Sequence, residues 1–323
     1  MKALIAVLAW LCLALGPGGL ATADEVWVGS DGDSTITVID SSTNRVVTTI
    51  SAPRTPHFLA FSPDGAYAFA VAHAGDTVAM IAAKERKVVA SVPAGALPNS
   101  VEVTPDGRQL WVGSTGSKDL TVVEIASRKK LATLKVGEIP IYLVFTRDGK
   151  RAYVGTWKTD NVSVLDTESR KILATIPVPK NPMGLLLLPD GRLVVASGLV
   201  KDEGENVISV IDTTTNKVVS KIDKKGEDPH WPVLHPDGKR IFISNRKAST
   251  VSVIDVVTLK IVKEFPAGKN PDTIGLTANG KLLYVVSRDT HSVVAIETET
   301  GKTVAEIPVV KKPHGMAVRP VVR

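Results

Sequence analysis

Residues that could bind a ligand occur at several of seven matching positions in the chain, each directly after a proline. The residues at this position are His57, Asn99, Ile141, Met183, His230, Asp272 and His314. Neutral imidazole and carboxylate groups are ligands for metals such as zinc or copper. Partly protonated histidines, together with arginines, would instead suit an anionic molecule. The mixture of polar and apolar types predicts a site confined to one part of a larger repeated structure.

The element that must position these residues is a repeat of about forty residues with four short strands. Its first tight turn recurs as Asp-Gly or Asn-Gly at Asp64, Asp106, Asp148, Asp190, Asp237 and Asn279, with spacings of 42, 42, 42, 47 and 42 residues. Its second strand keeps an aromatic or apolar residue in register at Trp27, Phe69, Trp111, Tyr153, Val195, Phe242 and Tyr284. Seven copies of a four-strand unit predict a closed ring.

The two ends of the chain complete one repeat between them. Residues from Glu25 to Ile50 supply strands two, three and four, while Pro313 to Arg319 supply a first strand alone. Sharing a blade in this way removes the exposed edge that an open stack of sheets would have. We therefore expect an all-β protein, a seven-bladed β-propeller of four-stranded blades over residues 24–323, with one blade shared between the N- and C-termini.

Several of these segments resemble the repeat of YVTN-type β-propeller proteins. They are Val-Ser-Val-Ile-Asp at 251–255, Tyr-Val-Gly-Thr at 153–156 and the Pro-Asp-Gly turns. Proteins of this type are commonly exported from bacterial cells and include ligand-binding, cell-surface and redox-accessory members. The resemblance covers the whole mature chain and implies the fold, whereas function has to be argued from the site.

The propeller fold implies which residues share a face. In such folds the first strand is innermost, and the loops entering it lie on the same face as the loops between strands two and three. Those loops carry Asp31, His73, Trp157, Arg246, Arg288 and His291, and the longest of them, Gly198 to Asn206, holds Lys201, Asp202, Glu203 and Glu205. The predicted ligand-binding residues are His57, His230, Asp272, His314, Asn99, His73, Arg246 and Arg288.

The N-terminal segment predicts export. Met-Lys precedes an apolar run from Ala3 to Leu15, and a small-residue Ala-x-Ala sequence ends at Ala23, as in a secretory signal peptide. The apolar run is about 13 residues, shorter than the roughly 20 needed to span a bilayer. We expect a signal peptide over residues 1–23, no membrane span after its removal, and a periplasmic or secreted product. The only cysteine, Cys12, would leave with it.

Composition and missing motifs narrow the function. The formal charge of +6 becomes +5 without Lys2, and the positive residues are spread evenly along the repeats. The sequence has no cluster of aromatic and basic residues of the kind that binds nucleic acid. We therefore do not expect nucleic-acid binding. The sequence contains no haem-attachment motif, phosphate-binding glycine loop or nucleophile elbow, so it identifies no cofactor and no catalytic residue. We expect a monomer.

Four interpretations of the histidine-rich face are considered, beginning with a metal site. His230 and His314 stand two blades apart on a ring that we expect to be wide, so we assign no metal ligands. A hydrated channel mouth without a specific ligand is a second interpretation. The leading one is a periplasmic or secreted binding or accessory protein for a small anionic molecule or a protein partner, and the resemblance adds an association with a quinone-cofactor redox system. The alternative is a metal-assisted lyase or lactone hydrolase that uses the same face.

Overall fold

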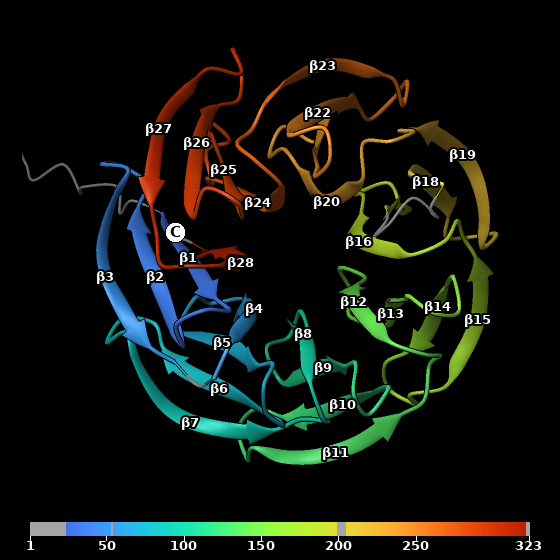
Figure 1. Ribbon diagram of the computed structural model, residues 1–323. Coiled ribbons are helices and arrows are strands. Elements are labelled where there is room, and N and C mark those ends of the chain that lie inside the picture. Colours follow the sequence, from blue (N-terminus) through green and yellow to red (C-terminus); the bar gives the residue numbers. More distant parts are fainter. Residues whose placement is uncertain (1–23, 53, 199–204, 321–323) are drawn as a thin grey trace, which may run out of the picture.

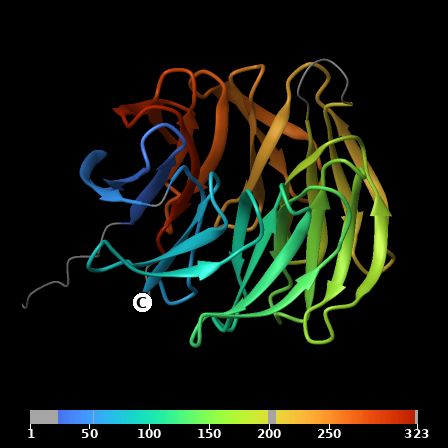
Figure 2. The same ribbon diagram turned by 60° about the horizontal axis from the view of Figure 1, so that its bottom comes forward.

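Seven four-stranded antiparallel sheets are arranged as blades around a central axis (Figure 1). This computed structural model describes residues 24–52, 54–198 and 205–320. The first strand of each blade lies nearest the centre and the fourth lies at the periphery, and Figure 2 shows the loops that connect the strands at the two ends of the ring. The predicted seven-bladed propeller is confirmed.

The blades are named here in chain order, with strands given from the centre outwards. Blade 1 contains β28 (Pro313–Val318), β1 (Glu25–Ser30), β2 (Thr35–Asp40) and β3 (Arg45–Ser51). Blade 2 contains β4 (Pro56–Phe61), β5 (Tyr67–Ala72), β6 (Thr77–Ala82) and β7 (Lys87–Pro93). Blade 3 contains β8 (Pro98–Val103), β9 (Gln109–Ser114), β10 (Asp119–Glu124) and β11 (Lys129–Leu134).

The remaining four blades repeat the same order. Blade 4 contains β12 (Pro140–Phe145), β13 (Arg151–Thr156), β14 (Asn161–Asp166) and β15 (Ile172–Pro177). Blade 5 contains β16 (Pro182–Leu187), β17 (Arg192–Ser197), β18 (Val207–Asp212) and β19 (Lys217–Asp223). Blade 6 contains β20 (Pro229–Leu234), β21 (Arg240–Asn245), β22 (Thr250–Asp255) and β23 (Ile261–Pro266). Blade 7 contains β24 (Pro271–Leu276), β25 (Leu282–Ser287), β26 (Ser292–Glu297) and β27 (Thr303–Pro308).

Blade 1 closes the ring by joining the two ends of the chain. Strand β28 pairs antiparallel with β1, with Val26 opposite Val318 and Val28 opposite Met316. The Arg319 backbone N–H also donates to the Glu25 carbonyl at 2.8 Å. The shared blade predicted from the sequence is confirmed, and its pairing covers the edge of β1 that would otherwise be open.

The core consists of apolar side chains packed between neighbouring sheets. The in-register residue of every second strand is buried, which explains why bulky apolar types recur there; these residues are Trp27, Phe69, Trp111, Tyr153, Val195, Phe242 and Tyr284. Most residues of the fourth strands are exposed or half-buried, as expected for the outer surface of a ring. The core therefore supports a rigid ring on which a central site can be built.

The aspartates of the repeated turns serve the backbone. The Asp106 carboxylate accepts hydrogen bonds from Thr104 Oγ1 at 2.6 Å and from the Arg108 N–H at 3.0 Å. Gly107 follows in the left-handed region, with φ 72°, which this turn requires. The same pattern at Asp64 and Asp148 confirms that these carboxylates form turns.

Some sequence predictions concern parts of the chain outside the described residues. They are the signal peptide over residues 1–23, Cys12 within it, and Lys201, Asp202 and Glu203 of the long loop. Within the described ranges, no helix is long and apolar enough to cross a membrane.

Candidate functional site

Seven equivalent backbone positions surround the mouth of the central channel. The residue before the proline of each innermost strand has a left-handed conformation, with φ between 50° and 59°, at Thr55, Leu97, Ile139, Asn181, Asp228, Asn270 and Lys312. The residue after that proline is the second residue of the same strand in every blade. Since the backbone repeats, the side chains alone make one side of the mouth different from the other.

Asp272 is the centre of the polar side of the mouth. Its buried carboxylate lies 2.8 Å from His230 Nε2 and 3.6 Å from His314 Nε2. Arg288 donates to it from Nη1 at 3.0 Å. One carboxylate from the intervening blade thus contacts both imidazoles and links His230 to His314.

The protonation states in this cluster follow from burial and charge. Burial lowers the pKa of His314 to about 3 and also lowers the pKa of His230. Although burial opposes ionisation of Asp272, its pKa lies well below the usual range because of its histidine neighbours and Arg288. At neutral pH the site holds neutral imidazoles at His230 and His314 beside an ionised carboxylate. The partial protonation expected from the sequence does not apply to these two histidines.

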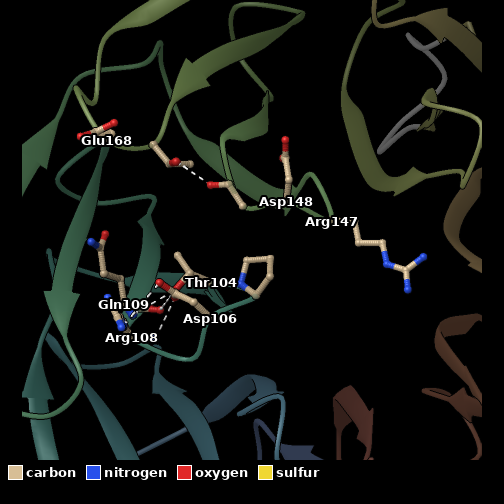
Figure 3. A pocket seen from close by; sticks show the side chains of 10 residues that line it. Thr104, Asp106, Arg108, Gln109, Arg147, Asp148 and Glu168 are labelled. Atoms are coloured by element: carbon tan, nitrogen blue, oxygen red, sulfur yellow. Dashed lines mark hydrogen bonds and ion pairs between the residues drawn. The ribbon is translucent and has the colours of Figure 1, made fainter.

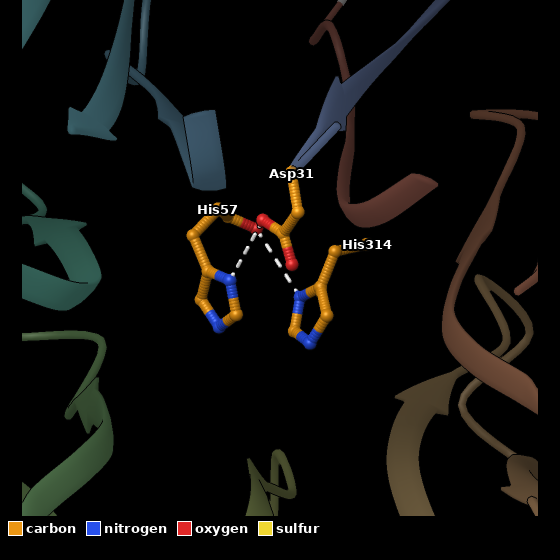
Figure 4. Close-up of side chains that lie close together, drawn as sticks. All are labelled: Asp31, His57 and His314. Carbon is orange, nitrogen blue, oxygen red and sulfur yellow. Dashed lines mark hydrogen bonds and ion pairs between the residues drawn. The ribbon is translucent and has the colours of Figure 1, made fainter. Parts of the chain in front are cut away.

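A second cluster lies where blade 1 meets blade 2 (Figure 4). The rings of His57 and His314 stack with centroids 3.7 Å apart, and His57 Nδ1 lies 3.0 Å from Asp31 Oδ1. His73 stacks on the other side of His57 at 4.6 Å, and its Nδ1 is 3.0 Å from the Pro98 carbonyl oxygen. Three predicted histidines thus form a continuous stack of rings at the mouth.

A glycine permits this stacking. Gly315 follows His314 in β28, and a Cβ atom at Gly315 would lie 2.2 Å from the His57 carbonyl oxygen of β4. Any larger residue would force the two innermost strands apart. The close approach of β28 and β4 therefore depends on Gly315.

A cavity of about 450 Å³ opens among these residues. Its lining joins predicted polar residues from one side of the ring to apolar residues from the other, and comprises His57, His73, Asn99, Thr115, Ile139, Ile141, Tyr142, Trp157, Met183, His230, Arg246 and His314. Ile141 and Met183 line the cavity as apolar side chains. A concave site of this size, with both apolar and polar side chains in its lining, is typical of small-molecule binding.

Three of the residues that line this cavity have hydrogen-bond donors without a partner among the described residues. Arg246 donates from Nε to Asp228 at 2.9 Å, and none of the described residues accepts from its terminal amino groups. Burial would lower the pKa of Arg246, but Asp228 and Asp272 outweigh burial and raise it. Trp157 Nε1 is buried without a partner among the described residues, and no described residue accepts from the Tyr142 hydroxyl.

Three aromatic side chains divide the channel below this cavity. Phe58, Tyr142 and Trp231 have ring centroids 4.7 to 5.3 Å apart. Phe58 and Trp231 also line a separate cavity of about 590 Å³, whose walls are mostly apolar and include Glu102. Burial raises the pKa of Glu102 to about 8. The aromatic trio therefore lies between the cavity lined by the histidines, called the upper cavity from here on, and the lower cavity lined by Phe58 and Trp231.

A cavity of about 600 Å³ lies on the opposite face, between the turns of blades 3 and 4 (Figure 3). It is lined by turn residues, including Asp106, Arg108, Arg147, Asp148 and Glu168. Asp106 and Asp148 already accept hydrogen bonds within their own turns. Because this arrangement repeats in other blades, we do not select this cavity as the functional site.

The eight predicted site residues all lie on the face that was expected. Six line the upper cavity, namely His57, His73, Asn99, His230, Arg246 and His314, while Asp272 and Arg288 lie behind it and hold the imidazoles. His291 is exposed and takes no part in the cavity. Sequence reasoning missed Tyr142 and Asp228, although Asp228 stands directly before the proline of β20 and could have been found from that repeated position.

Comparison with known proteins identifies the family. A family model described as a YNCE-like beta-propeller matches residues 73–146 and 190–320, which together exceed half of the chain. No curated protein matches the chain.

Solved structures with the same fold include enzymes of different kinds. Hydrazine synthase from Kuenenia stuttgartiensis is 24% identical with a TM-score of 0.75, covering 80% of this chain and 88% of that one. Dihydro-heme d1 dehydrogenase NirN is 19% identical with a TM-score of 0.68, and the match covers 92% of this chain and 75% of that one. A candidate 6-phosphogluconolactonase from Bacteroides fragilis is 17% identical with a TM-score of 0.77, covering 94% and 99%. At these identities the likeness is one of fold.

Proposed function

Since the chain belongs to the YNCE-like β-propeller family, we propose that it is an exported binding protein for a small anionic organic molecule. The binding site is the upper cavity, and the protein acts without catalysing a reaction on its ligand. Export is a prediction from residues 1–23. The family fixes the scaffold, so the proposal depends on the donors in the cavity.

The observation that carries the proposal is the set of unpartnered donors at the cavity. The terminal amino groups of Arg246, the hydroxyl of Tyr142 and Nε1 of Trp157 lack acceptors among the described residues. A buried donor without a partner, such as Trp157 Nε1, is costly, and an anionic oxygen in the cavity could accept from it and from Arg246 and Tyr142. Arginine is suited to this task because its planar fork pairs with carboxylates bidentately.

The apolar side chains of the cavity indicate what the uncharged part of the ligand is like. Ile139, Ile141 and Met183 face the same cavity as Arg246. A ligand with an anionic group and an apolar or aromatic body would fill both sides, and a volume of about 450 Å³ suits a small organic molecule. The carboxylates Asp228 and Asp272 are already paired with arginines, so they do not oppose the anion as free charges.

Two solved structures with a similar fold support a role of this protein in a redox system. The names of these structures, hydrazine synthase and dihydro-heme d1 dehydrogenase, are names of redox enzymes. Together with the resemblance to exported redox-accessory propellers, this supports an accessory role in a redox system, including one that uses a quinone cofactor. The ligand would then be a small anionic component of that system.

A titration with defined anions tests the binding function. The mature chain is titrated by calorimetry with benzoate, phthalate and citrate, which differ in apolar area and charge. We expect saturable binding of at least one of them, weakened about tenfold or more by Arg246→Gln, because a charge-assisted hydrogen bond is worth roughly 1.5–3 kcal/mol. Arg108→Gln, on the opposite face, is the matched control. Equal affinity in Arg246→Gln and the parent would refute the role of Arg246 in the site.

A second candidate is the metal-assisted lyase or lactone hydrolase. The cluster of Asp31, His57 and His314 favours it, because histidine and carboxylate side chains can hold a metal that polarises a carbonyl. The test is an assay for lactone hydrolysis by the protein supplemented with metal. Hydrolysis by the parent that is lost in His57→Ala would support this function over simple binding.

A further inference from the structure

We propose that Asp31, His57 and His314 form a binding site for one divalent transition-metal ion at the edge of the upper cavity. Each residue offers one ligand atom, and these atoms all lie within 4.8 Å of one another. Figure 4 shows the carboxylate of Asp31 above the facing Nδ1 edges of the two stacked imidazoles. This site goes beyond the proposed anion binding and uses none of the donors assigned to it.

The backbone holds all three residues before any ion arrives. The backbone N–H of Asp31 donates a hydrogen bond to the Lys312 carbonyl oxygen at 2.9 Å, which ties its loop to the residue before β28. His57 and His314 are the second residues of β4 and β28, innermost strands that Gly315 allows to approach. The ligands therefore come from rigid strands and a tethered loop, which reduces the entropy lost on binding.

The spacing is close to that of a bound ion. With metal–ligand bonds of about 2.0–2.2 Å, ligand atoms of a tetrahedral site lie roughly 3.3–3.6 Å apart. His57 Nδ1 and Asp31 Oδ1 are 3.0 Å apart, so this pair needs little adjustment. The other distances between ligand atoms are at most 4.8 Å, so the side chains must move by about 1 Å to reach one ion. The ion would then lie between the Nδ1 edges of the two rings and the carboxylate of Asp31.

A second layer of contacts orients His314. Its Nε2 lies 3.6 Å from Asp272 Oδ2. Its Nδ1 lies 3.3 Å from the His57 carbonyl oxygen, a contact that is a hydrogen bond only when Nδ1 carries the proton and that Nδ1 gives up on binding the ion. The tautomer with its proton on Nε2 directs that N–H toward Asp272 and leaves Nδ1 as a ligand. Carboxylates commonly orient metal-binding histidines in this way. Arg288 and His230 hold Asp272 in turn.

The ligand types select the class of ion. Two imidazole nitrogens and one carboxylate oxygen suit Zn²⁺, Fe²⁺ or Cu²⁺, whereas Ca²⁺ and Mg²⁺ prefer sites made of oxygen atoms. Arg288 lies 4.0 Å from Asp31 and opposes a cation, but its closer partner is Asp272 at 3.0 Å. Three protein ligands leave coordination positions open for water or for a molecule in the cavity.

Metal titration of the tag-free mature chain tests this site. After treatment with a chelator and its removal, Zn²⁺ is titrated by calorimetry and Co²⁺ by visible absorption. We expect one ion per chain and Co²⁺ bands typical of mixed nitrogen and oxygen ligands. Asp31→Asn and His314→Gln should each weaken binding at least about tenfold, while Mg²⁺ should not compete.

Two control variants separate this site from its surroundings. His291→Ala removes an exposed histidine of the same face and should bind the metal like the parent. Arg246→Gln should keep the metal site even where it abolishes anion binding, so the two proposals fail independently. Circular dichroism checks that each variant is folded. Absence of saturable Zn²⁺ or Co²⁺ binding by the parent, or unchanged affinity in folded Asp31→Asn and His314→Gln, would overturn the proposal.

Discussion

The imidazole rings of His57 and His314 stack with centroids 3.7 Å apart, although the residues stand near opposite ends of the chain. His314 belongs to β28, the single strand that the C-terminal part contributes to blade 1, and His57 belongs to blade 2. The candidate site is therefore assembled by the same pairing that closes the ring. Loss of closure would remove both stability and the site.

Removal of Pro313 to Arg323 should lower the melting temperature sharply. The deletion leaves β1 without the partner that pairs with Val26 and Val28, and exposes an open sheet edge. Thermal unfolding followed by circular dichroism measures the effect. An unchanged melting curve would mean that the shared blade does not support the ring.

Replacement of Leu97 by Asn should stabilise the protein. Leu97 has φ 51° and is 45% exposed, so its side chain gives up little buried area while its backbone conformation is unfavourable. Asn tolerates this conformation, and we expect a gain of about 1 kcal/mol. Asn181 occupies the same position in blade 5 with φ 59°, so Asn181→Leu is the reverse control and should destabilise. Urea unfolding of both variants decides the question, and a loss of stability in Leu97→Asn would reject the explanation.

Replacement of Glu102 by Gln should stabilise the protein at alkaline pH. Burial raises the pKa of Glu102 to about 8, above the ordinary value of 4.5. Below pH 4.5 the group is protonated in both folded and unfolded chains. As pH rises from 4.5 to 8, the unfolded chain ionises first, so the folded state loses stability, and the loss is complete above pH 8.

The comparison is made by melting the parent and Glu102→Gln at pH 5 and pH 9. The variant should melt higher than the parent by a larger margin at pH 9 than at pH 5, with about 2–4 °C for each kcal/mol of ionisation penalty that is removed. Glu85→Gln, at an exposed site, should change neither. A variant that gains no stability at pH 9 would show that Glu102 ionises without penalty in the folded protein.

The mature protein should begin at Asp24 and contain no thiol. This follows from the small-residue sequence that ends at Ala23 and from the position of Cys12 before it. Intact-mass measurement of protein exported by a bacterial host, with and without a thiol reagent, checks both points. A mass that includes residues 1–23 would reject the predicted cleavage.

The repeat made the ring and the position of its site residues predictable. A fixed spacing of 42 residues is enough to align His57 with His314 on one face, because each copy folds as the same four strands. The contact between His230 and Asp272 was not predictable, because it depends on how closely innermost strands approach. The approach of β28 and β4 is another example, since it depends on Gly315, whose role is visible only when the neighbouring strand is present.

The aromatic trio was beyond sequence reasoning for the same reason. Phe58, Tyr142 and Trp231 come from blades 2, 4 and 6 and meet only at the centre of the ring. Likewise, the pKa values of His230 and His314 are lowered by burial, which a repeat pattern does not reveal. Repetition predicts which residues share a face, whereas contacts across the axis require the assembled ring.

Native mass spectrometry of the protein purified from its own host tests whether the upper cavity binds a small anionic molecule. We expect a stoichiometric adduct of one such molecule on the parent, greatly reduced in Arg246→Gln and retained in Arg108→Gln. An adduct that persists at full occupancy in Arg246→Gln, or a parent that carries no small molecule under conditions that preserve non-covalent complexes, would contradict a binding function for the upper cavity.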